Sequence, residues 1–291
     1  MDAKGPRLNL PRALAFAILS CLLVQPVAAA DPAAAMSFGV ISQRSAVLTA
    51  QYWNPILRYV SRHSGVPLQI KLAKNAPEHA AMIGRSEFDF IYSNHHLTPE
   101  NDAVGYTVFA RPIDAAIRGQ IIVLTSSPIR TLAQLQGREV AFPSKVAFVG
   151  YHVPMDALLR AGISVKPQFS GNQEGALGQL LSGRVEAIAV NSQVARDFAE
   201  RQNVDYRVLW SSGEYLNIPI AAHPSVPKSQ VQAVQAALLQ MADDPEGVAI
   251  LTASAALIQQ HPPYGFVSTS DQEFSNVRRF YKNSLVNLSI Q

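Results

Sequence analysis

The sequence predicts an α/β protein with two lobes, each built on an open, mostly parallel sheet flanked by helices. Short apolar runs typical of buried strands alternate with amphipathic segments typical of helices between Ser37 and Ser211. The alternation occurs twice, and a mainly helical stretch follows from Lys228 onward. Strands that alternate with helices imply right-handed crossovers and a mostly parallel sheet. The repetition, with a late helical return, suggests two lobes with a sheet in each. A cleft between the two sheets is the expected place for a ligand.

The segment before this pattern predicts export. Three basic residues open the chain, an apolar run extends from Ala13 to Val24, and small residues precede Asp31. This order is typical of a signal peptide, so we expect residues 1–30 to be removed near Ala30 and the protein to reach the periplasm. The run is shorter than the roughly 20 residues of a membrane-spanning helix. It also continues past Cys21, which disfavours lipid attachment there.

Composition narrows the class of the exported chain. Its single cysteine lies in the leader, so the mature protein has no disulfide, thiol nucleophile or cysteine-based metal site. Residues 1–30 carry three basic and one acidic residue, which leaves a formal charge of +1 rather than +3. The absence of a basic cluster with interleaved aromatics argues against nucleic acid as a partner. We therefore expect a soluble exported globule, monomeric and without a cofactor.

In the first repeat, glycine and proline positions suggest where helices begin and end. Asn54-Pro55 predicts a helix start, with asparagine as the N-cap and proline at the first helical position, and Gly65 predicts its end. A short helix is expected from Pro77 to Gly84. Strands are predicted at Phe38–Ser42, Leu68–Leu72 and Phe88–Tyr92.

The second repeat and the helical tail follow the same reasoning. Strands are predicted at Gln120–Leu124, Glu139–Phe142, Val185–Val190 and Tyr206–Trp210. Helices are predicted at Thr131–Gly137, Tyr151–Ala161, Gln173–Ser182, Lys228–Met241, Pro245–Ala253 and Thr269–Ser284. Gly162 and Gly183 stand where two of these helices should end.

Several segments, taken in order, resemble the phosphonate-binding proteins of the phosphate/phosphite/phosphonate ABC importers. They are Phe38–Ser42, Gln51–Leu57, Ser127–Phe142, Gly150–Pro154, Gly183–Ala187 and Asp244–Gly247. The resemblance implies a type 2 periplasmic binding protein with two crossover strands that closes around a small anion. Gln120–Leu124 and Ile218–Ala222 would be the crossovers, which assigns residues 37–123 and 219–291 to lobe one and 124–218 to lobe two.

Two segments depart from the family pattern at the expected anion site. In Pro143–Gly150 the family has hydroxyl side chains, whereas this chain keeps Ser144, has apolar residues at the centre and adds Lys145. Lys145 would supply a charge to the ligand or be a solvated loop lysine. Further on, Gln173 takes the position of a family glutamate that holds a ligand amine. A neutral amide hydrogen-bonds but does not neutralise an ammonium group.

The candidate ligand-binding residues follow predicted strands or begin predicted helices at the cleft. They are Tyr52, Tyr92, Ser93, Asn94, His95, Ser144, Lys145, Tyr151, Asn172, Gln173, Asn191 and Ser192. Tyr52 would stack on a ligand or pack in the core. The adjacent His95 and His96 have no visible partners for a four-ligand metal site, so we expect no metal. Catalytic residues are not expected either.

The leading hypothesis is a solute-binding protein that delivers a small anionic or polar molecule to the membrane permease of an ABC importer. A second reading keeps the ligand but has the closed form report to a membrane sensor. A third is an enzyme on the same fold, for which His95-His96 is faintly similar to thiamine-pyrimidine synthases. The enzyme reading is disfavoured because no nucleophile elbow or H-E-x-x-H motif appears.

Overall fold

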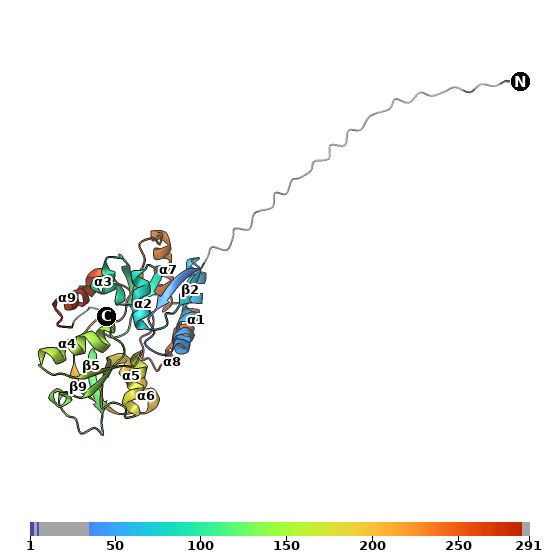
Figure 1. The fold of residues 1–291 in the computed structure, drawn as a ribbon. Helices are drawn as coiled ribbons and strands as arrows, with labels where there is room; N and C mark the ends of the chain where they lie inside the picture. Colours follow the sequence, from blue (N-terminus) through green and yellow to red (C-terminus); the bar gives the residue numbers. More distant parts are fainter. Residues whose placement is uncertain (3–4, 6–34, 287–291) are drawn as a thin grey trace. The chain divides into compact units, whose positions relative to one another are not determined.

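The computed structural model describes residues 1, 2, 5 and 35–286, and residues 35–286 form the fold (Figure 1). The expected signal peptide, its cleavage point and Cys21 lie outside the described residues. Within the part that is described, no helix is both long and apolar enough to cross a membrane. The two-lobed α/β architecture is confirmed: two separate sheets are each flanked by helices.

The first sheet has six strands in the order β11-β4-β10-β3-β1-β2. Strand β1 pairs in parallel with β2 and β3, whereas β10 runs antiparallel to both β3 and β4, and β11 runs antiparallel to β4. The sheet is therefore mixed rather than mostly parallel. Its strands are β1 (Met36–Val40), β2 (Leu68–Lys71), β3 (Phe90–Tyr92), β4 (Thr107–Pro112), β10 (Ile220–Ala222) and β11 (Phe266–Ser268).

The second sheet has five strands in the order β7-β6-β8-β5-β9. Strand β6 pairs in parallel with β7 and β8, and β5 runs antiparallel to β8 and β9, so this sheet is also mixed. Alternate residues of its strands enter two apolar layers, one on each face. Its strands are β5 (Gly119–Leu124), β6 (Glu139–Phe142), β7 (Lys166–Phe169), β8 (Ala187–Asn191) and β9 (Tyr206–Ser211).

Helices cover both sheets, and Figure 1 shows α1, α2 and α7 around the first and α4, α5 and α6 around the second. The α-helices are α1 (Ala46–Ser64), α2 (Ala76–Gly84), α3 (Pro99–Asp102), α4 (Val153–Arg160), α5 (Gln173–Leu181), α6 (Ser192–Gln202), α7 (Lys228–Gln240), α8 (Pro245–Ala256) and α9 (Ser275–Asn283). Short 3-10 turns are η1 (His95–Leu97), η2 (Leu132–Leu135) and η4 (Asp271–Phe274), and η3 (Phe148–His152) is a π-helical turn that continues into α4.

Helix α1 begins earlier than the sequence predicts. Its N-cap is Ser45, whose hydroxyl accepts a hydrogen bond from the backbone N–H of Leu48 at 3.2 Å, and Pro55 lies inside the helix. A proline within a helix removes one backbone hydrogen bond, but the buried face of α1 packs on the first sheet and holds the helix together. The predicted end is confirmed: Gly65 is the C-cap and has a left-handed backbone, with φ 70°.

The chain passes between the sheets one strand earlier than expected. Residues 119–123 were assigned to lobe one, yet β5 hydrogen-bonds to β8 and β9 and belongs to the second sheet. The outward crossover is therefore the segment between β4 and β5, and the return runs between β9 and β10. The two crossovers also pair with each other, because Ile117 and Tyr215 exchange backbone hydrogen bonds of 2.8 and 2.9 Å.

The end of the described chain makes a third link between the lobes. Helix α9 is held beside α3 by an ion pair between Arg278 and Asp102, at 2.8 Å. Beyond α9, the Asp156 carboxylate of α4 accepts hydrogen bonds from the backbone N–H of Leu285 at 2.7 Å and from the hydroxyl of Ser284 at 3.2 Å. Val286 then packs into an apolar layer of the second sheet. Residues near the end of the chain, assigned to lobe one from the sequence, thus also contact lobe two.

Candidate functional site

A cavity of about 40 Å³ lies between the two sheets, where loops at the ends of their strands meet. Loops after β1 and β3 contribute from the first sheet, those after β6, β7 and β8 contribute from the second, and both crossovers contribute one residue. We call this the interlobe cavity. Its lining residues are Ile41, Ser42, Gln43, Ala76, Asn94, His95, Ile117, Pro143, Ser144, Ala147, Phe148, Val149, Gly171, Asn172, Gln173, Asn191 and Ile218.

Helix N-termini from both lobes are directed toward the interlobe cavity. Asn172 caps α5 by accepting a hydrogen bond from the Gly175 N–H at 2.8 Å, and Asn191 caps α6 by accepting one from the Gln193 N–H at 2.9 Å. Both asparagines line the cavity, as does Ala76 in the first turn of α2. The positive ends of helix dipoles favour an anion. Among the described residues that line this cavity, none is Asp, Glu, Lys or Arg.

Two side chains of the cavity have polar atoms without a hydrogen-bond partner. The Ser144 hydroxyl and both ring nitrogens of His95 are buried and unpaired within the described part of the chain. Burial, followed by the neighbouring His152, lowers the pKa of His95 to about 3, so its ring is neutral and carries one N–H donor. An unpaired buried polar group costs about 1–3 kcal/mol, which a ligand with hydrogen-bonding oxygens would recover.

Gln173 is fixed within the wall of the interlobe cavity. Its Oε1 accepts a hydrogen bond from the Asn191 N–H at 3.0 Å, which ties the start of α5 to the end of β8. Its Nε2 lies against Gly150, because a Cβ added at Gly150 would be 2.7 Å from that nitrogen. A Cβ at position 150 would also lie 2.8 Å from Cγ of Pro143, so a side chain there would displace one of the two neighbours. The cavity wall has an amide where the family pattern has a carboxylate.

The structure brings together about half of the sequence-predicted residues in this cavity. Asn94, His95, Ser144, Asn172, Gln173 and Asn191 line it, whereas Tyr52 and Tyr92 line a second cavity described below. The remaining four residues line neither cavity. Ser93 is fully buried, and its hydroxyl accepts a hydrogen bond from the His95 N–H. Lys145 is exposed, with its ammonium 5.9 Å from the Phe169 ring. Tyr151 packs on Phe142, and the Ser192 hydroxyl accepts a hydrogen bond from the Arg118 N–H.

The apolar residues that replace the family hydroxyls have a packing role. Phe148 belongs to an apolar cluster that includes residues of both sheets. Its ring centroid lies 4.8 Å from that of Tyr215 in the return crossover and 5.4 Å from that of Tyr281 in α9. The loop after β6 therefore forms part of the contact between the lobes, in addition to one side of the cavity.

A second cavity, of about 50 Å³, adjoins the first at the shared residues Ile41 and Gln43. We call it the side cavity. It contains the two charged residues Arg44 and Asp114, and aromatic rings form part of its wall. Asp114 lies in the outward crossover, and its contacts come from residues about 80 and 100 positions away, so no local sequence pattern identifies it. The other members of its lining are Leu48, Thr49, Tyr52, Trp53, Tyr92, Pro112, Gln193, Asn217, Ile258, Gln260 and Phe266.

An ion-pair network joins the lobes beside the side cavity. The Arg44 guanidinium, from the loop after β1, lies 3.3 Å from the Asp197 carboxylate and 3.7 Å from that of Glu174. Arg201 also pairs with Glu174. The backbone adds a further link, because the Glu174 N–H donates to the Gln43 carbonyl at 3.3 Å. These contacts hold the two rims of the cleft together.

Four buried histidines lie near one another, and His95 among them lines the interlobe cavity. His79, His95 and His96 belong to the first lobe and His152 to η3 in the second. Burial is the main cause that lowers the pKa of each ring: to about 3 for His95 and His96, to about 4 for His152, and well below the usual value for His79. All four rings are therefore neutral near pH 7.

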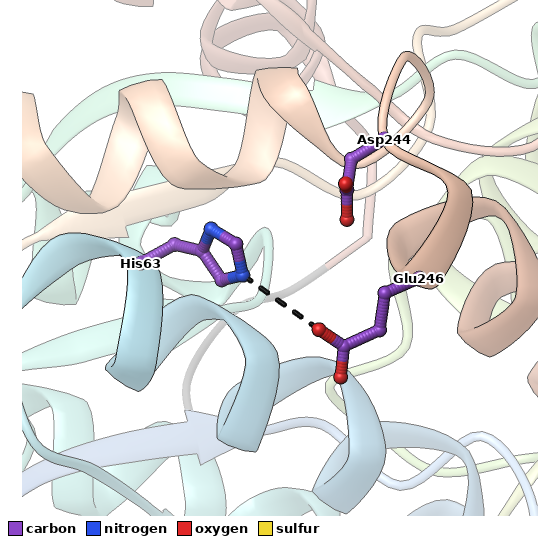
Figure 2. Close-up of side chains that lie close together, drawn as sticks. All are labelled: His63, Asp244 and Glu246. Carbon is purple, nitrogen blue, oxygen red and sulfur yellow. Dashed lines mark ion pairs between the residues drawn. The ribbon is translucent and has the colours of Figure 1, made fainter.

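A further group of possible metal ligands lies away from both cavities, where the end of α1 meets the start of α8. Figure 2 shows His63 facing Glu246, with Nε2 and Oε2 3.8 Å apart, and Asp244 beside them. Each acid already has a structural partner: Glu246 pairs with Arg62, and Asp244 caps α8 by accepting from the Gly247 N–H at 3.0 Å. We therefore assign this group to the packing of α1 against α8.

Solved structures with the same fold come from several bacteria. PhnD1 from Prochlorococcus marinus, in complex with methylphosphonate, has a TM-score of 0.71 and 16% identity, over 85% of this chain and 97% of that one. A binding protein component of an ABC phosphonate transporter from Pseudomonas aeruginosa has a TM-score of 0.72 and 16% identity, over 84% of both chains. XAC2383 from Xanthomonas citri, bound to chloride ion, has a TM-score of 0.66 and 18% identity, over 85% of this chain and 97% of that one.

At these identities the likeness establishes the fold alone, and no curated protein matches this chain in sequence. The sequence profile described as "ABC transporter, phosphonate, periplasmic substrate-binding protein" matches residues 38–274. The profile describes a transport component, which favours the importer hypothesis over the sensory one and the enzyme. Since the match covers most of the chain, this protein belongs to the family of periplasmic phosphonate-binding proteins of ABC transporters.

Proposed function

We propose that this protein captures a small phosphonate in the interlobe cavity and delivers it to the membrane permease of an ABC importer. The observation that carries the proposal is the pair of buried, unpaired polar side chains, Ser144 and His95, in a cavity where helix N-termini converge. Phosphonate oxygens would accept hydrogen bonds from the Ser144 hydroxyl and the neutral His95 ring. The dipoles of α2 and α5 would offset the ligand's charge without a lysine or arginine.

The interlobe cavity is small, and its polar lining suits the compact head of a tetrahedral oxyanion with a short substituent. The family member from Prochlorococcus marinus was solved with methylphosphonate, which supports this class as the first probe. The apolar side chains of Phe148 and Val149 would contact the alkyl group.

Isothermal titration calorimetry with methylphosphonate, phosphate, phosphite, sulfate and acetate tests the proposal. We expect methylphosphonate to bind, and Ser144→Ala to weaken it by about 1.5–3 kcal/mol, the usual contribution of a hydrogen bond to a charged group. That is roughly a 10- to 150-fold rise in Kd. Ser192→Ala is the matched control, because Ser192 lies outside the interlobe cavity. No binding of any of these anions, or an equal loss in both variants, would contradict the proposal.

The proposal includes export and a monomeric state. The chain would lose residues 1–30 near Ala30, fold in the periplasm and meet the permease as a closed, ligand-bound monomer. Mass spectrometry of protein recovered from a periplasmic fraction, together with light scattering, tests both points. A mature chain that begins at Cys21 with a lipid attached, or a stable dimer, would contradict them.

A further inference from the structure

The interlobe cavity offers an anion the positive ends of helix dipoles rather than charged side chains. Asn172 and Asn191, the N-caps of α5 and α6, line it, and Ala76 places the first turn of α2 beside them. A helix N-terminus carries the equivalent of roughly +0.5 elementary charge, so three of them supply roughly 1 to 1.5 positive charges. This field balances one negative charge on a ligand but not two.

Acidic side chains weaken this positive field. Glu78 lies in the first turn of α2 and Glu174 in the first turn of α5, where a carboxylate opposes the attraction of an anion. The guanidiniums of Arg44 and Arg201 both pair with Glu174, and that of Arg44 also pairs with Asp197. These two arginines are therefore already engaged by acids, and neither lines the interlobe cavity.

The buried polar side chains of the cavity supply hydrogen bonds without charge. The Ser144 hydroxyl and both ring nitrogens of His95 have no partner within the described residues, and each side chain is more than nine-tenths buried. The His79 ring lies behind that of His95, with centroids 5.9 Å apart, and His96 and His152 are also close to it. Burial lowers the pKa of all four rings, so none of them brings a cation to the ligand near pH 7.

We propose that the interlobe cavity binds phosphonate as the singly charged species, so that a doubly charged phosphonate enters only together with one proton from solvent. The inference rests on the proposed function and specifies the charge state of its ligand. The proton would remain on a phosphonate oxygen, and the resulting hydroxyl would donate to an amide oxygen at a helix cap. Asn172 and Asn191 each accept one capping hydrogen bond at that oxygen, which has a second lone pair.

Between pH 7 and pH 9 the ligand is the group whose charge changes. Methylphosphonate loses its second proton in this range, whereas the four buried histidines stay neutral because burial lowers their pKa. Burial raises the pKa of Asp197 to about 6, so this acid is already ionised. It also raises the pKa of Tyr52 and Tyr92, which stay neutral. Proton uptake on binding in this interval therefore reports the charge state of the bound ligand.

Isothermal titration calorimetry of the mature protein at pH 7, 8 and 9, in two buffers of different ionisation enthalpy, measures the Kd and the number of protons taken up. With methylphosphonate we expect uptake of about one proton at pH 9 and a Kd that rises about tenfold between pH 8 and pH 9. Methanesulfonate carries one charge at all three pH values, so its Kd should stay constant within about twofold, without proton uptake. Sulfate, doubly charged throughout, should bind about 100-fold or more weakly than methylphosphonate at pH 7.

Two variants test whether the proton goes to the protein instead. His95 lines the interlobe cavity, and Asp114 is a buried acid of the adjoining side cavity, where burial raises its pKa. His95→Gln and Asp114→Asn each remove one of these groups, and both variants should keep the proton uptake at pH 9 even where the Kd rises. Loss of the uptake in either variant, while methylphosphonate still binds, would place the proton on the protein and overturn the proposal.

The wild-type protein decides the matter even where a variant does not fold. Binding of methylphosphonate at pH 9 without proton uptake refutes the singly charged form and leaves the proposed function standing. Sulfate that binds within about tenfold of methylphosphonate at pH 7 refutes it too, because the cavity then accepts two charges. If neither methylphosphonate nor methanesulfonate binds at any of the three pH values, the proposed function fails and this inference fails with it.

Discussion

Mild acid should destabilise this protein through its buried histidines. An unfolded histidine has a pKa of about 6.5, whereas burial lowers the pKa of His95 and His96 to about 3 and that of His152 to about 4 in the folded state. Between these values the unfolded chain binds protons that the folded protein does not. The stability that the neutral rings provide is therefore complete above pH 7 and is lost progressively as the pH falls toward 4.

The magnitude follows from the same linkage. Between pH 7 and pH 5, one such histidine lowers the free energy of unfolding by about 1.9 kcal/mol, and three that titrate independently lower it by about 6 kcal/mol. Asp197 acts in the opposite direction: burial raises its pKa to about 6, so it offsets about 1.4 kcal/mol over this interval. Asp114, whose pKa is also raised, adds to that offset. A net loss of about 3–5 kcal/mol is a large part of a typical domain's stability.

Urea unfolding followed by tryptophan fluorescence at pH 7, 6 and 5 measures this loss directly. His152→Phe keeps a ring in the apolar cluster and removes one titrating group, so the loss between pH 7 and 5 should shrink by about 2 kcal/mol. A free energy of unfolding that is flat from pH 7 to pH 5, or equal slopes in the wild type and His152→Phe, would refute the reasoning.

Three substitutions give further predictions. Phe148→Ala should lower the free energy of unfolding by about 3–5 kcal/mol in urea titrations, since it opens a void in the apolar contact between the lobes; a loss under 1 kcal/mol would contradict that packing. Gly150→Ala should raise the Kd of methylphosphonate at least tenfold by displacing the Gln173 side chain. An unchanged Kd in calorimetry would contradict this, because it would show that Gln173 moves aside without affecting the ligand. Glu174→Gln should raise the ligand Kd several-fold by removing about 1 kcal/mol from the closed state. Glu186→Gln, which breaks an exposed pair with Arg138, is its control, and equal Kd values in the two variants would contradict the role of the network.

Local patterns predict the parts of the fold that depend on local interactions. Gly65, Gly162 and Gly183 do have left-handed backbones at or beside helix ends, and the apolar runs of β1, β6 and β8 form interior strands of the two sheets. Strands β4 and β11 were not predicted from the sequence, because they are defined by pairing with segments that are distant in sequence. The sheet to which β5 belongs could not be predicted either, and nor could its direction. Both depend on its antiparallel pairing with β8 and β9, which are distant in sequence.

The same distinction applies to the candidate site. Asn191 was predicted at the cleft because it follows a predicted strand, and strand ends in such sheets meet at one edge. Ser144 and Asn172 were predicted from the family resemblance, and all three residues line the interlobe cavity. Lys145 was also a candidate from the resemblance, with a solvated loop lysine as the alternative; it is exposed, and its ammonium lies 5.9 Å from the Phe169 ring. Asp114 has no local signature at all, and it becomes a candidate only when folding brings Gln193 and Asn217 to it.

The tail beyond α9 changes what opening the cleft requires. The two crossovers pair with each other and form the place where a hinge motion of the two lobes would occur. The segment from Ser284 to Val286 spans the gap at a separate point and is bonded to α4 of the second lobe while α9 stays on the first. Any opening of the cleft about the paired crossovers would therefore have to stretch this segment or break its hydrogen bonds to Asp156. The end of the chain thus adds a cost to opening that the two crossovers alone would not impose.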